Sequence, residues 1–245
     1  RSELPYAEEV ARDVGTDHYE RNIPISFDDF RAVAKYFDEP FADSSNVPTH
    51  LLSAFAREHV KVALSGDGGD EIFFGYGEYR SHHHFPRWKK LVGGLMRADP
   101  FFFYKRSHLN IFSPSERRAL LMDRSGHEDD VTARFDLSAA RTPLQKINLV
   151  EIYMGLPGDM LTKVDRASMM HSLEIRSPFL QHDLAQFVFN LPDDYKTSTT
   201  TGKLVLAESC KDLLPSSVFT RKKQGFGAPV RLWLTHHFDE LNGWT

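Results

Sequence analysis

Apolar residues recur every three or four positions near the start of the chain, and this spacing predicts helices. We expect a first helix over residues 6–14 that ends at Gly15. A second helix is expected over 27–37, with Ser26 as its N-cap and acidic residues in its first turn. A third helix is expected over 48–59.

Two segments of this first part have the pattern of strands. Residues 16–25 form a polar strand candidate, and residues 60–64 form a short apolar one that we expect to be buried. A glycine-rich loop and a further helical stretch follow the second strand. Strands that alternate with helices imply a parallel sheet covered on both faces, so residues 1–80 are expected to form an α/β portion.

The second half of the chain has the periodicity of helices. We expect helices over 144–156, 161–173, 182–190 and 203–211, and less distinctly within 81–141. The Thr-rich stretch 197–201 is expected to be a solvated loop. Residues 81–245 are therefore predicted to be a mostly helical remainder of the same domain.

Composition narrows the class of protein. The 245 residues are 41% hydrophobic and carry a net charge of −4, as is typical of a soluble globular protein. We therefore expect no nucleic-acid partner and no binding to an anionic membrane. No apolar stretch approaches the roughly 18 residues that span a bilayer. The single cysteine, Cys210, excludes an intramolecular disulfide and fits a reducing cytoplasm.

The loop after the strand at 60–64 has the composition of a nucleotide site. Backbone at the carboxyl end of a parallel strand is well placed to hold anions. Carboxylates beside a phosphate repel it unless a divalent cation intervenes, which favours Mg²⁺ with a nucleotide and leaves one carboxylate as a general base. A tight structural turn in which two acids cap the next helix is equally open. The loop contains Ser65, Gly66, Asp67, Gly68, Gly69, Asp70 and Glu71.

Four charged residues lie in apolar surroundings later in the chain. Asp165 and Arg166 fall within a predicted helix, and Glu174 and Arg176 follow it. Buried charges need partners, so these residues either pair with one another in a structural network or surround a polar ligand. Their spacing does not decide between the two.

Two basic segments attract functional interpretations. Residues 221–227 combine glycines with Lys223, which suits either a loop that brings a lysine to a phosphate or a solvated turn. His82, His83 and His84 are adjacent, and adjacent side chains on a helix or strand cannot all point at one metal ion. We expect these histidines to lie at the surface.

The segment 64–76, read as Leu-Ser-Gly-Asp-Gly-Gly-Asp-Glu-Ile-Phe-Phe-Gly-Tyr, closely resembles the signature of the synthetase domain of glutamine-hydrolysing asparagine synthetases. Three further blocks match in order: 39–49, 156–180, and 220–229 with Trp233. The resemblance implies an α/β fold of the ATP-pyrophosphatase type, with a parallel sheet whose N-terminal part is incomplete here, followed by a helical portion. It implies a ligase that uses Mg-ATP to convert aspartate to β-aspartyl-AMP, from which ammonia derived from glutamine displaces AMP.

The resemblance also assigns roles to residues. Ser65 and Gly66 match the pair that contacts ATP. Asp67 matches an acid important for forming the adenylate and handling the ammonia proton, although many members have the longer glutamate. Lys223 matches the lysine that neutralises charge developing on the phosphates. Asp70 and Glu71 would lie on the magnesium or phosphate side, and Asp165, Arg166, Glu174 and Arg176 would line or support the aspartate and pyrophosphate side.

Two parts of the family pattern are absent from these 245 residues. One is the pyrophosphate loop, Ser-Gly-Gly-x-Asp-Ser, and the other is the glutaminase domain with its N-terminal cysteine. The first twenty residues resemble the family's segment just after its second strand. We therefore expect the C-terminal piece of a longer cytoplasmic enzyme, inactive alone because it lacks most of its phosphate-binding donors. A homodimer is left open.

Two alternatives remain at this point. A β-lactam synthetase-like paralogue would use the same adenylation with an intramolecular amine as the nucleophile. A non-catalytic nucleotide-binding scaffold would have lost the phosphate loop altogether. The sequence upstream in the gene would distinguish the three, because the glutaminase cysteine and the phosphate loop would both lie there.

Overall fold

The structure is a computed structural model, and it describes residues 3–83, 101, 104, 116, 119–120, 131–221, 225 and 227–238. The chain divides into two compact units. The first unit comprises Arg1–Gly66, Gly158–Pro178 and Ser209–Thr245, and the second comprises Asp67–Pro157 and Phe179–Glu208. Each unit takes residues from both 1–80 and 81–245, so the division at residue 80 stays a prediction.

The first unit contains the three helices expected near the start of the chain. They are α1 (Leu4–Val14), α2 (Phe27–Tyr36) and α3 (Asn46–Arg57). Gly15 ends α1 in the left-handed region, with φ of 73°. Ser26 caps α2 and Asp29 returns a bond to the Ser26 backbone N–H, which completes a capping box. The unit also contains α10 (Thr162–Met169), α14 (Ser217–Thr220) and α15 (Val230–His236).

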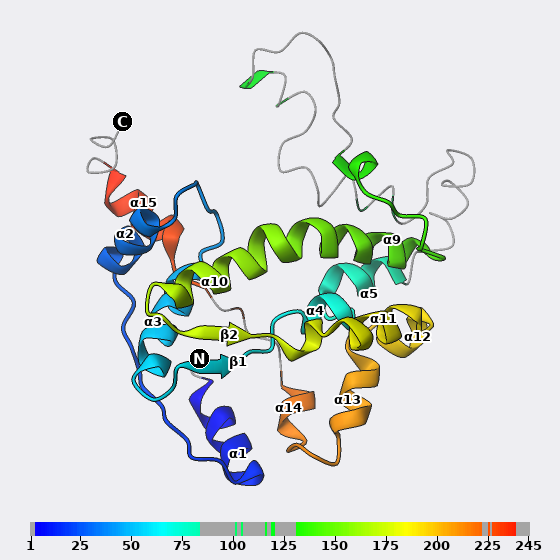
Figure 1. The fold of residues 1–245 in the computed structure, drawn as a ribbon, viewed down its shortest axis with the longest axis horizontal. Helices are drawn as coiled ribbons and strands as arrows, with labels where there is room; N and C mark the ends of the chain where they lie inside the picture. Colours follow the sequence, from blue (N-terminus) through cyan, green and yellow to red (C-terminus); the bar gives the residue numbers. More distant parts are fainter. Residues whose placement is uncertain are drawn as a thin grey trace. The chain divides into compact units, whose positions relative to one another are not determined.

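The described part of the first unit has one sheet, made of β1 (Val62–Leu64) and β2 (Glu174–Arg176). The two strands run parallel, and Ala63 pairs with Ile175. Helix α10 packs against both α3 and β2 (Figure 1). The prediction of an α/β fold with a parallel sheet is therefore confirmed at this level.

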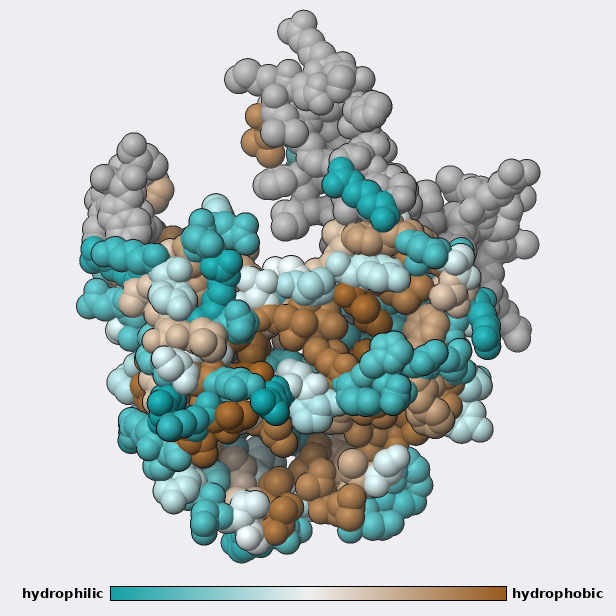
Figure 2. Space-filling model, viewed as in Figure 1, coloured by the Kyte–Doolittle hydropathy of each residue, from teal (hydrophilic) through white to brown (hydrophobic). Residues whose placement is uncertain are grey.

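Two details of the predicted sheet are wrong. Residues 16–25 form no strand. The described sheet is also not covered on both faces, since Val62 is 43% and Leu64 is 73% exposed. A parallel strand is buried only where other elements cover both of its faces, and the face that carries Val62 and Leu64 is left partly open. Residues 174–176, in the part predicted to be mostly helical, supply the second strand, β2. Figure 2 shows apolar residues open to solvent on the face in view.

The second unit is helical in its described part. In this unit α9 (Pro143–Val150) packs against α5 and continues into a π-helical stretch, η2 (Glu151–Leu161), that runs on into the first unit. Pro157 lies inside η2, and its missing N–H accounts for part of the departure from α-helical bonding. The others are α4 (Gly69–Ile72), α5 (Gly77–His83), η1 (Val131–Arg134), η3 (Pro178–Leu180), α11 (His182–Asn190), α12 (Asp193–Lys196) and α13 (Leu204–Cys210).

Two apolar clusters hold α4 in place in the second unit. Ile72 and Phe73 pack with Val188 and with partly buried residues of η3, α11 and α13. The next residue, Phe74, enters a different cluster with Tyr79 and with residues of α9. Because consecutive side chains enter different clusters, both faces of this short turn are fixed by burial.

Two smaller expectations are wrong in part: one of the described histidines is buried, and the Thr-rich stretch is solvated only at residues 199–201. His82 is 9% exposed, with its Nδ1 2.7 Å from the Glu78 carbonyl oxygen, and His83 lies 2.8 Å from Asp194. His82 is therefore not at the surface, because α5 packs against α9, whereas the His83 side chain is 20% exposed; His84 lies outside the described residues. Thr197 is 1% exposed and forms an antiparallel bridge with Gly202, so the Thr-rich stretch is anchored at its base.

Candidate functional site

The segment 65–71 passes from the first unit into the second, and its first two residues follow the end of β1. The Ser65 N–H donates to the Arg176 carbonyl at 2.9 Å, and the Ser65 hydroxyl lies 3.1 Å from that of Ser177. Gly66 is exposed, and a Cβ there would meet nothing within 4 Å. Backbone at the carboxyl end of the sheet is thus open to a ligand, as the glycine pattern predicts.

Glu174 and Arg176 lie on the same face of the sheet as Val62 and Leu64. The Arg176 Nε donates to Glu174 Oε1 at 2.8 Å, and the side chains of Arg176 and Glu174 are 67% and 54% exposed. The expectation that this pair is enclosed by apolar residues is therefore wrong, because the sheet face around them is open. The two charges pair with each other at the surface.

Asp165 and Arg166 are adjacent on α10, but their side chains have different surroundings. The Asp165 side chain is exposed. Arg166 is half-buried, forms an ion pair with Asp38, and lies 5.9 Å from the centre of the Phe37 ring. Arg166 is thus held by the end of α2, with its guanidinium engaged at both an acid and an aromatic ring.

A buried ion pair in the first unit was not anticipated from the sequence. Lys163 is 6% exposed and donates to Asp43 at 3.0 Å, while Ser45 donates to the same carboxylate through its N–H and its hydroxyl at 2.9 and 2.7 Å. Burial acts to raise the pKa of Asp43, but the bonds from Ser45 and Lys163 outweigh it and hold this pKa below its usual value. In the sequence, the position of Lys163 on the apolar face of a predicted helix could have indicated this buried pair.

Residues of two sequence blocks meet in the first unit. The Ala228 N–H donates to the Ser44 carbonyl at 3.3 Å, and a Cβ on Gly227 would lie 3.0 Å from the Ser44 hydroxyl. A shallow cavity of about 560 Å³ opens there, lined by Ser44, Ala228, Pro229, Val230, Arg231, Leu232 and Thr235. Lys223 lies outside the described residues.

The second unit begins with a tight turn at Gly68 and Gly69. Gly68 has a φ of 85° and precedes the first residue of α4, and a Cβ on it would lie 2.5 Å from Leu180 Cγ. Gly69 is buried against the Phe179 ring. Gly68 is therefore required by the turn itself, a Cβ on Gly69 would press on the Phe179 ring, and Asp67 beside them is half-buried.

Asp70 has a cationic partner that sequence reasoning missed. The Lys203 Nζ lies 3.2 Å from the Asp70 carboxylate, and the Lys203 N–H donates to the Phe73 carbonyl at 3.0 Å. Gly75 lies so close that a Cβ would overlap both side chains. Lys203 is therefore held beside the glycine turn. In the sequence, the only indication of this role was the Gly202-Lys203 pair that follows the Thr-rich stretch.

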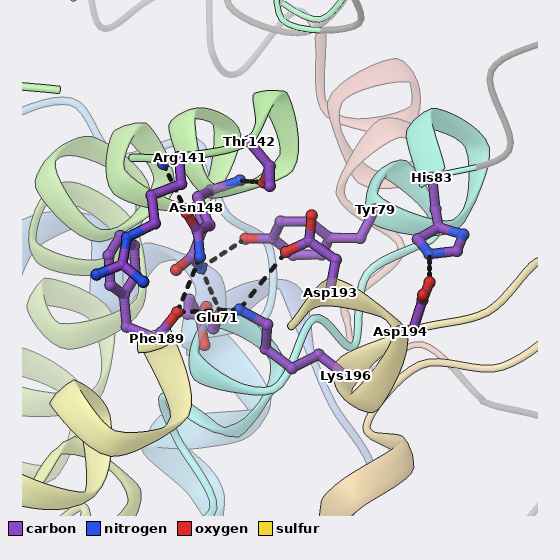
Figure 3. Close-up of polar contacts among 11 residues, drawn as sticks. Glu71, Tyr79, His83, Arg141, Thr142, Asn148, Phe189, Asp193, Asp194 and Lys196 are labelled. Carbon is purple, nitrogen blue, oxygen red and sulfur yellow. Dashed lines mark hydrogen bonds and ion pairs between the residues drawn. The ribbon is translucent and has the colours of Figure 1, made fainter. Parts of the chain in front are cut away.

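Glu71 points into the fold of the second unit. It is 2% exposed and its carboxylate accepts a hydrogen bond of 2.5 Å from the Tyr76 hydroxyl. Burial and the Glu71 carboxylate both raise the pKa of Tyr76. The Glu71 carbonyl accepts a bond from Asn148 at 2.6 Å (Figure 3). These contacts are those of a residue that holds α4 in place.

The described residues lack two features, a cluster of metal-ligating side chains and a membrane-spanning helix. They contain no group of three or more His, Cys, Asp or Glu side chains able to hold a metal ion. Mg²⁺ bound together with nucleotide phosphates needs only one or two carboxylates, so this result leaves such a site compatible with the acids present. No helix in the described part of the chain is long and apolar enough to cross a membrane.

Comparison with known proteins gives a consistent result. A family model described as asparagine synthase matches residues 1–245. The chain is 29% identical to asparagine synthetase [glutamine-hydrolyzing] 1 of Bacillus subtilis, over 99% of this chain and 42% of the relative. It is 32% identical to a putative asparagine synthetase [glutamine-hydrolyzing] of Mycobacterium tuberculosis, over 95% of this chain and 40% of the relative. The chain thus spans about two fifths of the length of these curated relatives.

Proposed function

Because the chain belongs to the asparagine synthase family, we propose that it is the synthetase part of an enzyme that makes asparagine from aspartate, ATP and ammonia released from glutamine. An oxygen of the aspartate side-chain carboxylate attacks the α-phosphorus of ATP, and pyrophosphate leaves. Ammonia then attacks the acyl carbon of β-aspartyl-AMP, loses a proton, and displaces AMP. The family match over the whole chain is the observation that carries this proposal.

Ser65 and Gly66 would contact ATP. The Ser65 N–H is already satisfied by Arg176, so its hydroxyl is the group left to reorient toward a nucleotide. The open space around Gly66 lets a ligand approach the backbone closely. The ATP-pyrophosphatase type of fold is part of this proposal, since such sheets bind nucleotide at the carboxyl ends of their strands.

Asp67 and Lys223 would carry the chemistry. Asp67 would accept the ammonia proton, and Lys223 would neutralise charge on the leaving pyrophosphate. Lys203 is a second cation that the fold holds beside the glycine turn, through Asp70 and the Phe73 carbonyl.

Asp70 is the carboxylate that fits a magnesium ion bound with ATP, whereas Glu71 is buried and bonded to Tyr76 and does not fit. When bound, Mg²⁺ would neutralise the phosphates and orient them for displacement. Asp70 is partly exposed, and its carboxylate would turn from the Lys203 pair, at 3.2 Å, toward the ion. Lys203 then remains available to the phosphates.

Glu174 and Arg176 would recognise the charged backbone groups of aspartate. Arg176 would suit the α-carboxylate and Glu174 the α-ammonium, and both lie on β2, whose last residue, Arg176, accepts the Ser65 N–H through its carbonyl. Arg166 and Asp165 would support this side of the site from α10.

We also propose a cytoplasmic location, in keeping with one unpaired cysteine, and a glutaminase domain elsewhere in the complete polypeptide.

The experiment uses the complete polypeptide that carries these 245 residues. Aspartate-dependent release of pyrophosphate is measured for the unaltered protein and for Asp67→Asn and Lys223→Ala, with Lys35→Ala, an exposed lysine of α2, as the matched control. The first two substitutions are expected to lower kcat at least about a hundredfold, and the control by less than twofold. Near-normal release by either variant removes that residue from the assignment. The 245-residue chain alone is expected to release none.

A further inference from the structure

Lys196, the last residue of α12, is fully buried in the second unit, and none of the proposed roles uses it. Its Nζ donates to the Phe189 carbonyl at 3.3 Å and lies 3.7 Å from the Asp193 carboxylate (Figure 3). It also lies 4.2 Å from the centre of the Phe74 ring. A lysine is almost never fully buried without such partners, because its charge loses hydration.

The Phe74 ring is the contact that links Lys196 to α4. Phe74 is the second residue after α4, next to the C-cap Phe73, and adopts a φ of 57°, which is unfavourable for a bulky side chain. Its ring stacks on Tyr79, with the ring centres 4.4 Å apart, and Gly202 lies against its carbonyl. The strained turn therefore persists because Lys196, Tyr79 and Gly202 hold it from different sides.

The same network also reaches α4 itself, at Glu71. Asn148, which is 1% exposed, donates to the Tyr79 hydroxyl at 3.2 Å and to the Glu71 carbonyl at 2.6 Å. The short helix is thus anchored at Glu71 through Asn148 and at Phe74 through Lys196. Asp67 lies only a few residues before Glu71, so its position depends on both anchors.

We propose that Lys196 is a positioning residue for the acidic turn at residues 67–71: by holding the Phe74 ring it fixes α4, and through α4 it fixes Asp67 and Asp70. The consequence for catalysis rests on the proposed function. Lys196 acts through Phe74 and not on a substrate, so its loss lowers the rate of the chemical step more than it weakens substrate binding.

The charge on Lys196 gives the contact a dependence on pH. The groups that face its ammonium are Asp193 of α12, the Phe189 carbonyl of α11 and the Phe74 ring after α4. Burial lowers the pKa of Lys196 to about 8, against the opposing effect of Asp193. A neutral amine loses both the attraction to the ring and the ion pair, so the contact weakens as pH rises through about 8.

The test compares the unaltered complete polypeptide with Lys196→Met combined with Asp193→Asn. The double substitution removes both charges, so that no buried carboxylate is left unpaired. Lys35→Met is the matched control, because Lys35 is exposed on α2 in the first unit. Two quantities are measured: amide hydrogen exchange in the peptide 67–76, and kcat with KM for ATP and for aspartate.

The double variant is expected to exchange these amides at least about fivefold faster and to lower kcat about tenfold, with both KM values within about threefold. The kcat of the unaltered protein is expected to fall above pH 8, and the variant to lack this fall. Exchange within twofold of the unaltered protein, or an unchanged kcat, overturns the proposal.

A second measurement needs no substitution. Exchange of the peptide 67–76 in the unaltered protein, corrected for its intrinsic pH dependence, is expected to be faster at pH 9 than at pH 7. Equal corrected rates overturn the proposal. If the unaltered protein releases no pyrophosphate, the proposed function fails, while the exchange experiments still decide whether Lys196 holds the turn.

Discussion

The substitution Gly68→Ala tests the physical origin of the glycine turn. Gly68 has a φ of 85°, and a Cβ on it would lie 2.5 Å from Leu180 Cγ and 3.3 Å from Leu180 Cδ1. Leu180 belongs to the apolar cluster around Ile72 and Phe73, so it has little freedom to move away. Both the backbone conformation and the packing therefore oppose a side chain at this position.

The two costs can be added. A left-handed backbone costs an L-residue about 1–2 kcal/mol. Forcing a methyl group into a packed cluster costs about 1–3 kcal/mol. Gly68→Ala is therefore expected to lower the free energy of unfolding by about 2–5 kcal/mol.

Urea unfolding followed by circular dichroism measures this difference. The matched control is Gly66→Ala, because a Cβ at Gly66 meets nothing within 4 Å and its φ is not positive. The control is expected to change the free energy of unfolding by less than about 1 kcal/mol, even though it would hinder ATP. A loss below about 1 kcal/mol for Gly68→Ala would refute the reasoning.

Three further predictions concern stability. Asn148→Leu is expected to cost about 1–3 kcal/mol in urea unfolding, because a buried carbonyl loses its donor, and a change below about 0.5 kcal/mol would contradict this. Ser26→Ala is expected to cost about 1 kcal/mol and Ser216→Ala, which makes no capping bond, clearly less; equal losses would count against the capping box. Burial lowers the pKa of His50 and of His171 below 6.5, so the unfolded chain binds more protons below that pH. Thermal stability is therefore expected to fall on acidification from pH 7.5 to 5.5, and less so in His171→Gln; an equal fall in both would contradict the prediction.

Helices whose signals are local were predicted well from the sequence. The helix that starts after Ser26 was expected from its cap and acidic first turn, and the one that ends at Gly15 from its terminal glycine. Both signals act within one turn of the backbone, so a single sequence is enough to read them.

The sheet was predicted less well because strand pairing is not a local property. β2 consists of Glu174, Ile175 and Arg176, and one apolar residue between two charges has no distinctive pattern. Its pairing with β1 joins segments far apart in the chain. The apolar sequence of β1 correctly predicted a strand, but the exposure of Leu64 depends on which helices cover the sheet.

In the candidate site, too, local features were predicted from the sequence and long-range contacts were not. The glycine-rich turn and its acids were found from their spacing, and Gly68 proves to be required by the turn. The partners Lys203 of Asp70 and Lys163 of Asp43 come from distant segments, so only the fold brings them together. The ligand roles of Asp67 and Lys223 stay predictions, since they depend on molecules that bind there.

Transfer of oxygen from aspartate to AMP tests the central claim most directly. The complete polypeptide is incubated with ATP, Mg²⁺, glutamine and aspartate labelled with ¹⁸O in its side-chain carboxylate, and the AMP is examined by mass spectrometry. If β-aspartyl-AMP forms, one labelled oxygen appears in the phosphate of AMP as asparagine is made, and Asp67→Asn abolishes the transfer. Unlabelled AMP, or ADP and phosphate in its place, would contradict adenylation of aspartate by this family member.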